Sequence, residues 1–213
     1  MAVIVPSVTA VDAKTYREQM ANAATFAARV HLDFSDGKFA PVKLINLAQA
    51  YWPEGMLADL HLMVTDPAAH FETAVSLKPH MVIVQAEAEG NIVAMILQLR
   101  ALGIKTGVAL LQDTSPKAAH SLIAEADHVL IFSGDLGHFG GTADMELLKK
   151  IPEIRAINPI AEIGWDGGVT FENAAQLALG GVEVLVSGGT IQKAADPAAA
   201  YKQLVELGNK GSE

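Results

Sequence analysis

Residues 30–37 read Val30-His31-Leu32-Asp33-Phe34-Ser35-Asp36-Gly37, a short run whose first part alternates apolar and polar side chains. This period of two is typical of a β-strand, and it places His31 and Asp33 on one face and Leu32 on the other. The two polar side chains can therefore converge on one point. A buried pair of this kind is unfavourable unless it binds something, so the strand predicts a functional site as well as a sheet.

Seven further short runs rich in apolar residues continue this pattern along the chain. The expected strands cover residues 2–5, 30–34, 57–63, 81–85, 105–110, 128–132, 160–164 and 182–187. Segments of helical period lie between them at residues 13–28, 67–77, 92–102, 116–124, 145–150, 171–179 and 197–207, with a weaker one at 44–51. Strands that alternate with helices in this way predict repeated βα units around a parallel sheet.

Eight such pairs predict an α/β protein that forms a single (β/α)8 TIM barrel, with one domain over residues 1–213. The length of 213 residues is within the range of that fold. A doubly wound open sheet is the alternative, but the Gly-x-Gly-x-x-Gly pattern expected after its first strand is absent from the sequence. No linker or compositional break indicates a second domain.

The composition disfavours several classes of partner. With 15 basic and 24 acidic residues the formal net charge is −9, and no cluster of Lys or Arg is present to bind nucleic acid or an anionic membrane. Only 18% of the residues are charged, so we expect some surface to be buried in a homo-oligomer. Cysteine is absent, which excludes disulfides and thiolate ligands. No signal peptide or membrane span is visible, and we expect a cytoplasmic protein.

Two other predicted strands carry polar residues near their carboxyl ends, where the active sites of such barrels lie. His61 lies near the end of the third predicted strand, and Asp166 follows the seventh. Taken alone, His61 is typical of a histidine hydrogen-bonded in the core, and an aspartate before glycine is a common turn. Together with His31 and Asp33 they supply two imidazoles and two carboxylates, a ligand set suited to one divalent Zn, Mn, Fe or Co ion.

Glycines cluster just after the later predicted strands, at the same end of the barrel. The last strand runs into Ser187-Gly188-Gly189-Thr190, a pattern typical of the phosphate-binding loop that barrels build from their last two βα loops. Glycine allows the backbone to approach a phosphate, and the Thr190 hydroxyl can donate a hydrogen bond. An ordinary strand-to-helix turn is the alternative.

In order along nearly the whole chain, these residues resemble the ribulose-phosphate 3-epimerase family. The matching segments are Pro6-Ser7, His31-x-Asp33-x-x-Asp36-Gly37-x-Phe39-x-Pro41, Asp59-Leu60-His61-Leu62-Met63, Phe139-Gly140-Gly141, Asp166-Gly167-Gly168 and Gly188-Gly189. The resemblance implies a metal held by His31, Asp33, His61 and Asp166, with Asp33 and Asp166 exchanging the C3 proton of the substrate. We expect the small ketose phosphate itself at Ser7, Gly140, Gly141, Gly167, Gly168, Gly188, Gly189 and Thr190.

The family's reaction, D-ribulose 5-phosphate to D-xylulose 5-phosphate, is the leading hypothesis, but several departures fall at the site. Ser35 replaces a usual Met, Gln85 a usual His and Val42 a usual Asn, and residues 134–138 replace Asn-Pro-Gly with a longer loop. A hexulose-phosphate (allulose 6-phosphate) 3-epimerase and a catalytically silent sugar-phosphate-binding paralogue therefore stay open. Related decarboxylases and hexulose-phosphate synthases carry Asp-x-Lys-x-x-Asp on a barrel strand. The corresponding segment here, Asp33-Phe34-Ser35-Asp36, has no lysine, which disfavours these two activities.

Overall fold

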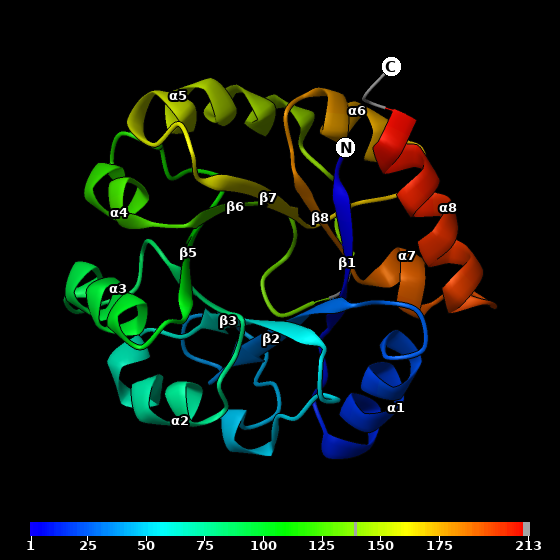
Figure 1. Cartoon of the computed structure of the whole chain (residues 1–213), viewed down its shortest axis with the longest axis horizontal. Coiled ribbons are helices and arrows are strands. Elements are labelled where there is room, and N and C mark those ends of the chain that lie inside the picture. The colour runs from blue at the N-terminus through cyan, green and yellow to red at the C-terminus, as the bar shows by residue number, and fades with distance from the viewer. Residues whose placement is uncertain (139, 211–213) are drawn as a thin grey trace.

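The computed structural model describes residues 1–138 and 140–210. Its strands form one closed parallel barrel in which each strand pairs with the next and β8 closes on β1 (Figure 1). The helices form a ring outside the barrel (Figure 1). The predicted (β/α)8 barrel is confirmed. No helix within the described ranges is long and apolar enough to cross a membrane.

The bounds of the elements follow the predicted order. The strands are β1 (Val3–Val8), β2 (Arg29–Ser35), β3 (Leu57–Met63), β4 (Met81–Gln85), β5 (Lys105–Leu110), β6 (His128–Phe132), β7 (Glu162–Asp166) and β8 (Val184–Ser187). The α-helices are α1 (Ala13–Ala23), α2 (Phe71–Ser76), α3 (Ile92–Ala101), α4 (His120–Glu125), α5 (Lys150–Ile157), α6 (Ala174–Leu179), α7 (Gly189–Gln192) and α8 (Pro197–Asn209). Short 3-10 helices are η1 (Leu47–Gln49), η2 (Pro67–His70) and η3 (Met145–Lys149).

The predicted bounds are wrong at β1, β7, the weak helix and three further helices. The helix predicted over 13–28 ends at Ala23, and the one predicted over 116–124 starts at His120. The helix predicted over 145–150 is the short η3, and α5 follows it at Lys150–Ile157. β1 continues through Pro6, since Ser7 still pairs with His31 in the ladder. The prediction for β7 starts two residues too early, because the Asn158 side chain accepts hydrogen bonds from the N–H groups of Ile160 and Ala161 and holds them in a turn. This shift moves Asp166 from a loop onto the last position of the strand. The weak helix at 44–51 is only the short η1.

The helices η2 and α8 start at an aspartate cap followed by proline. Asp66 and Asp196 each precede a proline at the first helical turn, and their carboxylates accept from the N–H groups of Ala68 and Ala199 at 3.1 and 3.0 Å. A proline has no N–H to leave unpaired at this position, and the cap satisfies one of the remaining donors.

Two apolar layers hold the barrel together. One lies between the strands and the surrounding helices and contains the outward-facing residues of β2, Val30, Leu32 and Phe34. The other fills the barrel interior with Val5, Met81, Ile83, Ala109, Leu130, Val184 and Val186. This interior layer is thin, because polar side chains occupy the inward positions at both ends of several strands.

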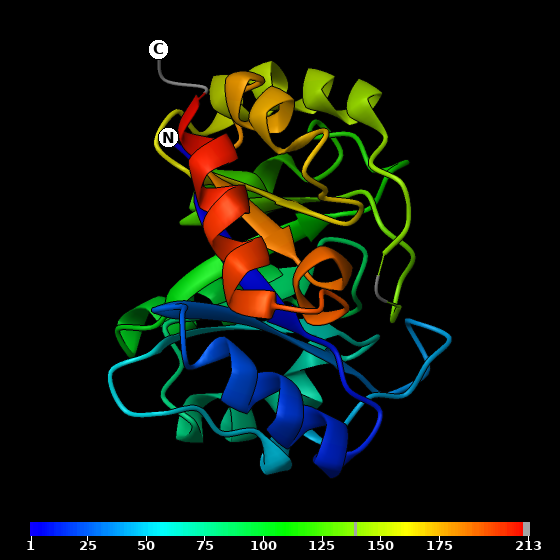
Figure 2. The same ribbon diagram turned by 90° about the vertical axis from the view of Figure 1, so that its right-hand side faces the viewer.

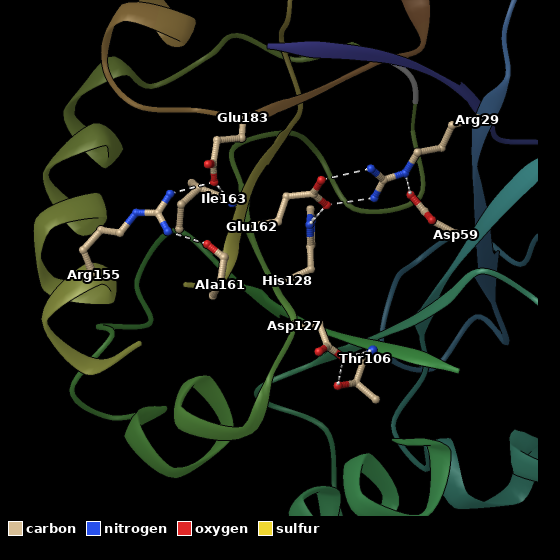
Figure 3. A network of polar contacts seen from close by, with 10 residues as sticks. All are labelled: Arg29, Asp59, Thr106, Asp127, His128, Arg155, Ala161, Glu162, Ile163 and Glu183. Atoms are coloured by element: carbon tan, nitrogen blue, oxygen red, sulfur yellow. Dashed lines mark hydrogen bonds and ion pairs between the residues drawn. The ribbon is translucent and has the colours of Figure 1, made fainter. Parts of the chain in front are cut away.

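The amino end of the barrel is closed by a polar network that we call the amino-end cluster, formed by Arg29, Asp59, His128 and Glu162 (Figure 3). Arg29 Nε lies 2.7 Å from Asp59 Oδ2, and its Nη2 lies 3.0 Å from Glu162 Oε2. His128 Nδ1 lies 2.8 Å from the same Glu162 oxygen. Gly164 makes room for this cluster, since a Cβ there would lie 2.3 Å from His128 Nε2.

At the carboxyl end, the loops that follow β2 and β6 extend beyond the strands and meet (Figure 2). Ala40, Leu44 and Met63 form a small apolar cluster here, against which Val42 and Leu136 pack. Gly137 approaches Val42 so closely that a Cβ on it would lie 3.2 Å from the Val42 Cβ. These two loops therefore cover one side of the barrel mouth.

Candidate metal centre and active site

Four polar side chains converge at the carboxyl end of the barrel, and we call them the carboxyl-end cluster: His31 and Asp33 on β2, His61 on β3 and Asp166 on β7. One ligand atom of each lies within 4.8 Å of the others. The strand register explains the meeting, since Asp33 pairs with His61 across β2 and β3. The sequence-predicted ligand set is thus brought together in space.

The contacts inside this cluster centre on Asp33. Its Oδ1 lies 3.1 Å from His61 Nδ1 and 3.3 Å from His31 Nε2, while Thr9 donates its hydroxyl to Oδ2 at 2.5 Å. Asp166 Oδ2 stands farther off, 3.9 Å from each of the two histidine nitrogens. Both histidines are almost fully buried. Asp33 is therefore firmly held and Asp166 is loosely held.

Burial and neighbouring charges move the two carboxyl groups in opposite directions. Burial raises the pKa of Asp33, but hydrogen bonds from His31 and His61 outweigh this and hold the pKa well below its ordinary value. For Asp166, burial raises the pKa, and the negative charge of Asp33 raises it further. Without a metal, Asp33 is thus the more acidic of the two carboxyl groups.

The cluster fits a divalent cation. Two imidazole nitrogens and two carboxylate oxygens are ligands that Zn, Mn, Fe and Co accept, and their mutual distances are compatible with a shared ion. Among the described residues, the ion pairs of Asp33 and Asp166 involve only His31 and His61, with no Lys or Arg. Two adjacent carboxylates repel each other, and a bound cation would supply the missing positive charge.

A cavity of about 310 Å³ lies above the cluster and opens at the barrel mouth. Asp33 and Asp166 line its floor, and the loops after β6, β7 and β8 line its walls. All the predicted substrate-binding residues border it: Ser7, Gly140, Gly141, Gly167, Gly168, Gly188, Gly189 and Thr190. Phe139, predicted beside them, lies outside the described residues. The volume is suited to a small ligand.

The predicted glycines have different structural roles. Gly167 and Gly168 have φ of +104° and +68°, and a Cβ on either would lie 2.1 Å from a backbone nitrogen of the β6 loop. These two glycines allow the β7 and β6 loops to pack together. At Gly189, by contrast, the nearest atom to an added Cβ is 3.9 Å away. Gly189 therefore leaves space for a ligand and is not needed for packing.

The Thr190 hydroxyl is already engaged. It donates to the Val169 carbonyl oxygen at 2.6 Å and so links the β7 and β8 loops. The peptide N–H groups of Gly189 and Thr190 lie in the first turn of α7, where no preceding helical carbonyl can accept them. The groups that this loop offers to an anion are thus backbone donors.

Sequence reasoning missed two residues of the site, Thr9 and Lys193, and the role of a third, Gln85. Thr9, just past β1, orients Asp33 through its hydroxyl. Among the described residues that line the cavity, Lys193 is the only Lys or Arg, and it lies next to the glycine loop after β8. Gln85 Nε2 lies 2.8 Å from His61 Nε2, behind the metal ligands. In the sequence, Gln85 stands out only as a departure from the family pattern. Thr9 and Lys193 belong to no motif that would identify them as site residues.

The remaining departures lie in the loops. The Ser35 hydroxyl accepts from the Gly37 N–H at 3.1 Å, and Ser35 does not line the cavity. Val42 packs in the apolar cluster between the β2 and β6 loops. Asp135, Gly137 and His138 of the altered loop line the cavity. The wall after β6 is therefore more polar than the cap over β2.

Comparison with known proteins agrees with this geometry. Residues 3–192 match the model of the ribulose-phosphate 3 epimerase family. The ribulose-phosphate 3-epimerase of Mycobacterium leprae is 30% identical over 212 residues, covering 94% of this chain and 92% of the relative. That of Aquifex aeolicus is 29% identical and covers 97% of both chains.

Solved structures support the fold. 3-Keto-L-gulonate-6-phosphate decarboxylase from Vibrio cholerae has a TM-score of 0.72 at 13% identity, with 100% of this chain and 99% of that chain covered. 3-Hexulose-6-phosphate synthase from Salmonella typhimurium has a TM-score of 0.66 at 16% identity, with 98% and 99% covered. These likenesses show a shared barrel alone. The family match over most of the sequence goes further: this chain belongs to the ribulose-phosphate 3-epimerase family, isomerases that act on carbohydrates.

Proposed function

We propose that the protein is a metal-dependent epimerase that inverts C3 of a ketose phosphate, with D-ribulose 5-phosphate to D-xylulose 5-phosphate as its reaction. The observation that carries the proposal is the convergence of two aspartates from separate strands with two histidines at the floor of one cavity. Family membership supports the reaction class.

Inversion at C3 requires that a proton leave one face of the carbon and another arrive on the opposite face. A proton next to a ketone is weakly acidic, so both steps need a positioned acid or base. Asp33 on β2 and Asp166 on β7 reach the cluster from separate strands, so one can take the proton as a carboxylate while the other returns one as a carboxylic acid. In the reverse direction the two exchange roles.

His31, Asp33, His61 and Asp166 would hold one divalent ion, Zn, Fe, Mn or Co. When bound, such an ion polarises the substrate carbonyl and stabilises the negative charge of the enediolate. The protein keeps both imidazoles buried, which excludes water from their side of the cluster. Thr9 fixes the Asp33 carboxylate, so its proton-accepting oxygen is already oriented.

The phosphate of the substrate would bind in the wall formed by the β8 and β6 loops. Peptide N–H groups at Gly189 and Thr190 offer hydrogen bonds, and Lys193 supplies a positive charge at the mouth. Gly140 and Gly141 line the facing loop. An overall charge of −9 makes such a local positive site necessary for anion binding.

A hexulose phosphate is the second candidate substrate. The observation in its favour is the polar wall after β6, where Asp135 and His138 line the cavity and could contact an additional hydroxyl group. A silent binding paralogue is disfavoured because all four side chains of the carboxyl-end cluster are present and converge.

The test is hydrogen exchange at C3. A chelator first strips the protein of metal, and samples are then reloaded with each of the four ions. Stripped and reloaded samples are incubated in deuterated water with a panel of pentulose and hexulose phosphates. We expect deuterium at C3 together with the epimeric sugar, only in reloaded samples, and fastest with ribulose 5-phosphate. Binding of the sugars without exchange would support the silent paralogue, and faster exchange with allulose 6-phosphate would support the second substrate.

A further inference from the structure

Gln85, the last residue of β4, forms an unusual contact with the carboxyl-end cluster. It is fully buried, and its Nε2 lies 2.8 Å from His61 Nε2, on the side of the ring that faces away from the other three ligands. Its own oxygen, Oε1, is buried and has no hydrogen-bond partner among the described residues. A buried carbonyl oxygen without a partner is costly, so this arrangement calls for an explanation.

The position of one proton accounts for the contact. A neutral imidazole carries its proton on one nitrogen and a lone pair on the other. His61 Nδ1 lies 3.1 Å from Asp33 Oδ1 and 3.2 Å from His31 Nε2, while the Gln85 amide nitrogen lies 2.8 Å from His61 Nε2. Because an amide nitrogen only donates, this contact requires the lone pair on Nε2 and therefore the proton on Nδ1. This pairing satisfies both ring nitrogens, but only while no metal ion is bound.

A metal ion shared by the four side chains needs the lone pair on Nδ1, since this is the His61 atom that meets the other ligands. The ring then carries its proton on Nε2, with no change in its charge. That N–H would point at the Gln85 NH2 group, so two donors would oppose each other. Rotation of the carboxamide by half a turn removes the conflict, because it brings the unpartnered Oε1 to the position that accepts the new N–H.

We propose that Gln85 is a positioning residue for the metal centre, whose carboxamide turns over on metal loading and holds His61 in the tautomer that binds the ion. The inference rests on the proposed metal-dependent function. A carboxamide both donates and accepts at one end of the side chain without changing its charge, so glutamine suits both states. Outer-shell partners of metal-bound histidines commonly contribute tenfold to a hundredfold to metal affinity.

Two substitutions at this position should act in opposite directions. Gln85→Met keeps the length but leaves the buried Nε2–H of the loaded state without a partner, so we expect the Kd for Zn²⁺ to rise about 10- to 100-fold. Gln85→Glu, which as a carboxylate only accepts, favours the metal-binding tautomer and should bind Zn²⁺ at least as tightly as wild type. Gln112→Met is the matched control, since Gln112 donates to the Ser133 carbonyl and does not contact the cluster.

The experiment measures Zn²⁺ affinity by competition with a chromophoric chelator, after circular dichroism has shown that each variant is folded. A second measurement reads the tautomer in the wild-type protein itself. Two-bond nitrogen–proton NMR spectra of wild-type protein labelled with ¹⁵N-histidine should show the His61 proton on Nδ1 without metal and on Nε2 with zinc. The signals are assigned by their loss in His61→Gln.

Equal Zn²⁺ affinities for wild type and Gln85→Met, or one unchanged His61 tautomer in both NMR samples, would overturn this inference alone. A wild-type protein that binds none of Zn, Fe, Mn and Co would overturn the proposed metal-dependent function along with it.

Discussion

The barrel carries a group of histidine and carboxylate side chains at each end, and largely the same strands supply both. β2 bears Arg29 in the amino-end cluster and His31 and Asp33 in the carboxyl-end cluster, β3 bears Asp59 and His61, and β7 bears Glu162 and Asp166. On each of these strands, the residue of the carboxyl-end cluster follows the residue of the amino-end cluster by two or four positions. It therefore points to the same inward face of the barrel. The two ends nevertheless differ in one component, the arginine.

At the amino end, Arg29 neutralises two carboxylates at once. Burial raises the pKa of Glu162, but hydrogen bonds from His128 and Arg29 outweigh it, so the pKa lies well below its ordinary value of 4.5. At the carboxyl end no such cation is present among the described partners, and the pKa of Asp166 is raised. Similar side chains thus form a closed ion-pair network where an arginine is built in, and a cluster that could hold a metal ion where it is not.

The largest contrast concerns catalysis. Asp33→Asn and Asp166→Asn should each lower kcat for epimerisation by about 10²- to 10⁴-fold, because an amide neither takes nor returns a proton. Asp59→Asn at the amino end should retain wild-type kcat per folded molecule. Steady-state kinetics with ribulose 5-phosphate check all three, and substantial turnover in either of the first two variants contradicts the two-aspartate scheme.

Metal content gives the next contrast. His61→Ala removes one of four ligands, so we expect metal affinity to fall by at least about tenfold, with activity lost in parallel. His128→Ala, which removes the buried strand histidine of the amino-end cluster, should bind metal as wild type does. Metal analysis after dialysis against a weak chelator makes the measurement. Equal loss of metal in His61→Ala and His128→Ala would contradict the assignment of metal binding to the carboxyl-end cluster.

Two glycines, one at each end of the barrel, should respond differently to an added side chain. Gly189→Val should raise KM for the sugar phosphate about tenfold with metal content unchanged, because the added side chain occupies ligand space. Gly164→Ala should instead destabilise the fold by about 1–3 kcal/mol, since its Cβ would overlap His128. Kinetics and denaturant unfolding separate the two effects. An unchanged KM for Gly189→Val would move the phosphate site elsewhere.

The smallest effect is on stability. Glu162→Gln should lower the free energy of unfolding at pH 7 by about 1–2 kcal/mol, a value reduced by the partial exposure of this side chain. Because the folded pKa of Glu162 is lowered, its contribution is present above its ordinary pKa of 4.5 and is lost as pH falls below that value. The difference in free energy of unfolding between Glu162→Gln and wild type should therefore become smaller in acid. Urea unfolding over a pH series tests the trend, and a gap that widens in acid contradicts it.

Much of this architecture could be predicted from the sequence. Short apolar runs gave the bounds of β3, β4, β5 and β6, because hydrophobic period and turn residues mark a buried parallel strand from both sides. The period of two also placed His31 and Asp33 together. The predicted start of β7 was wrong because the Asn158 side chain holds the following residues in a turn. The apolar Ile160, which the hydrophobic pattern assigned to the strand, is 90% exposed in this turn.

What the sequence could not supply was partnership between distant residues. Lys193 and Thr9 lie in no motif, and only the fold brings them to the cavity. The same is true of Gln85, whose departure from the family pattern was visible but whose contact with His61 was not. Nor does the sequence show that Arg29 neutralises the amino-end carboxylates, because its contact with Glu162 joins residues far apart in the chain.

The most direct test of the central claim is anomalous X-ray diffraction at the zinc absorption edge from crystals grown with zinc. We predict one strong peak among His31, Asp33, His61 and Asp166, and none within the amino-end cluster. A strong peak among Arg29, Asp59, His128 and Glu162, or no peak at the carboxyl end in zinc-loaded crystals, would contradict it.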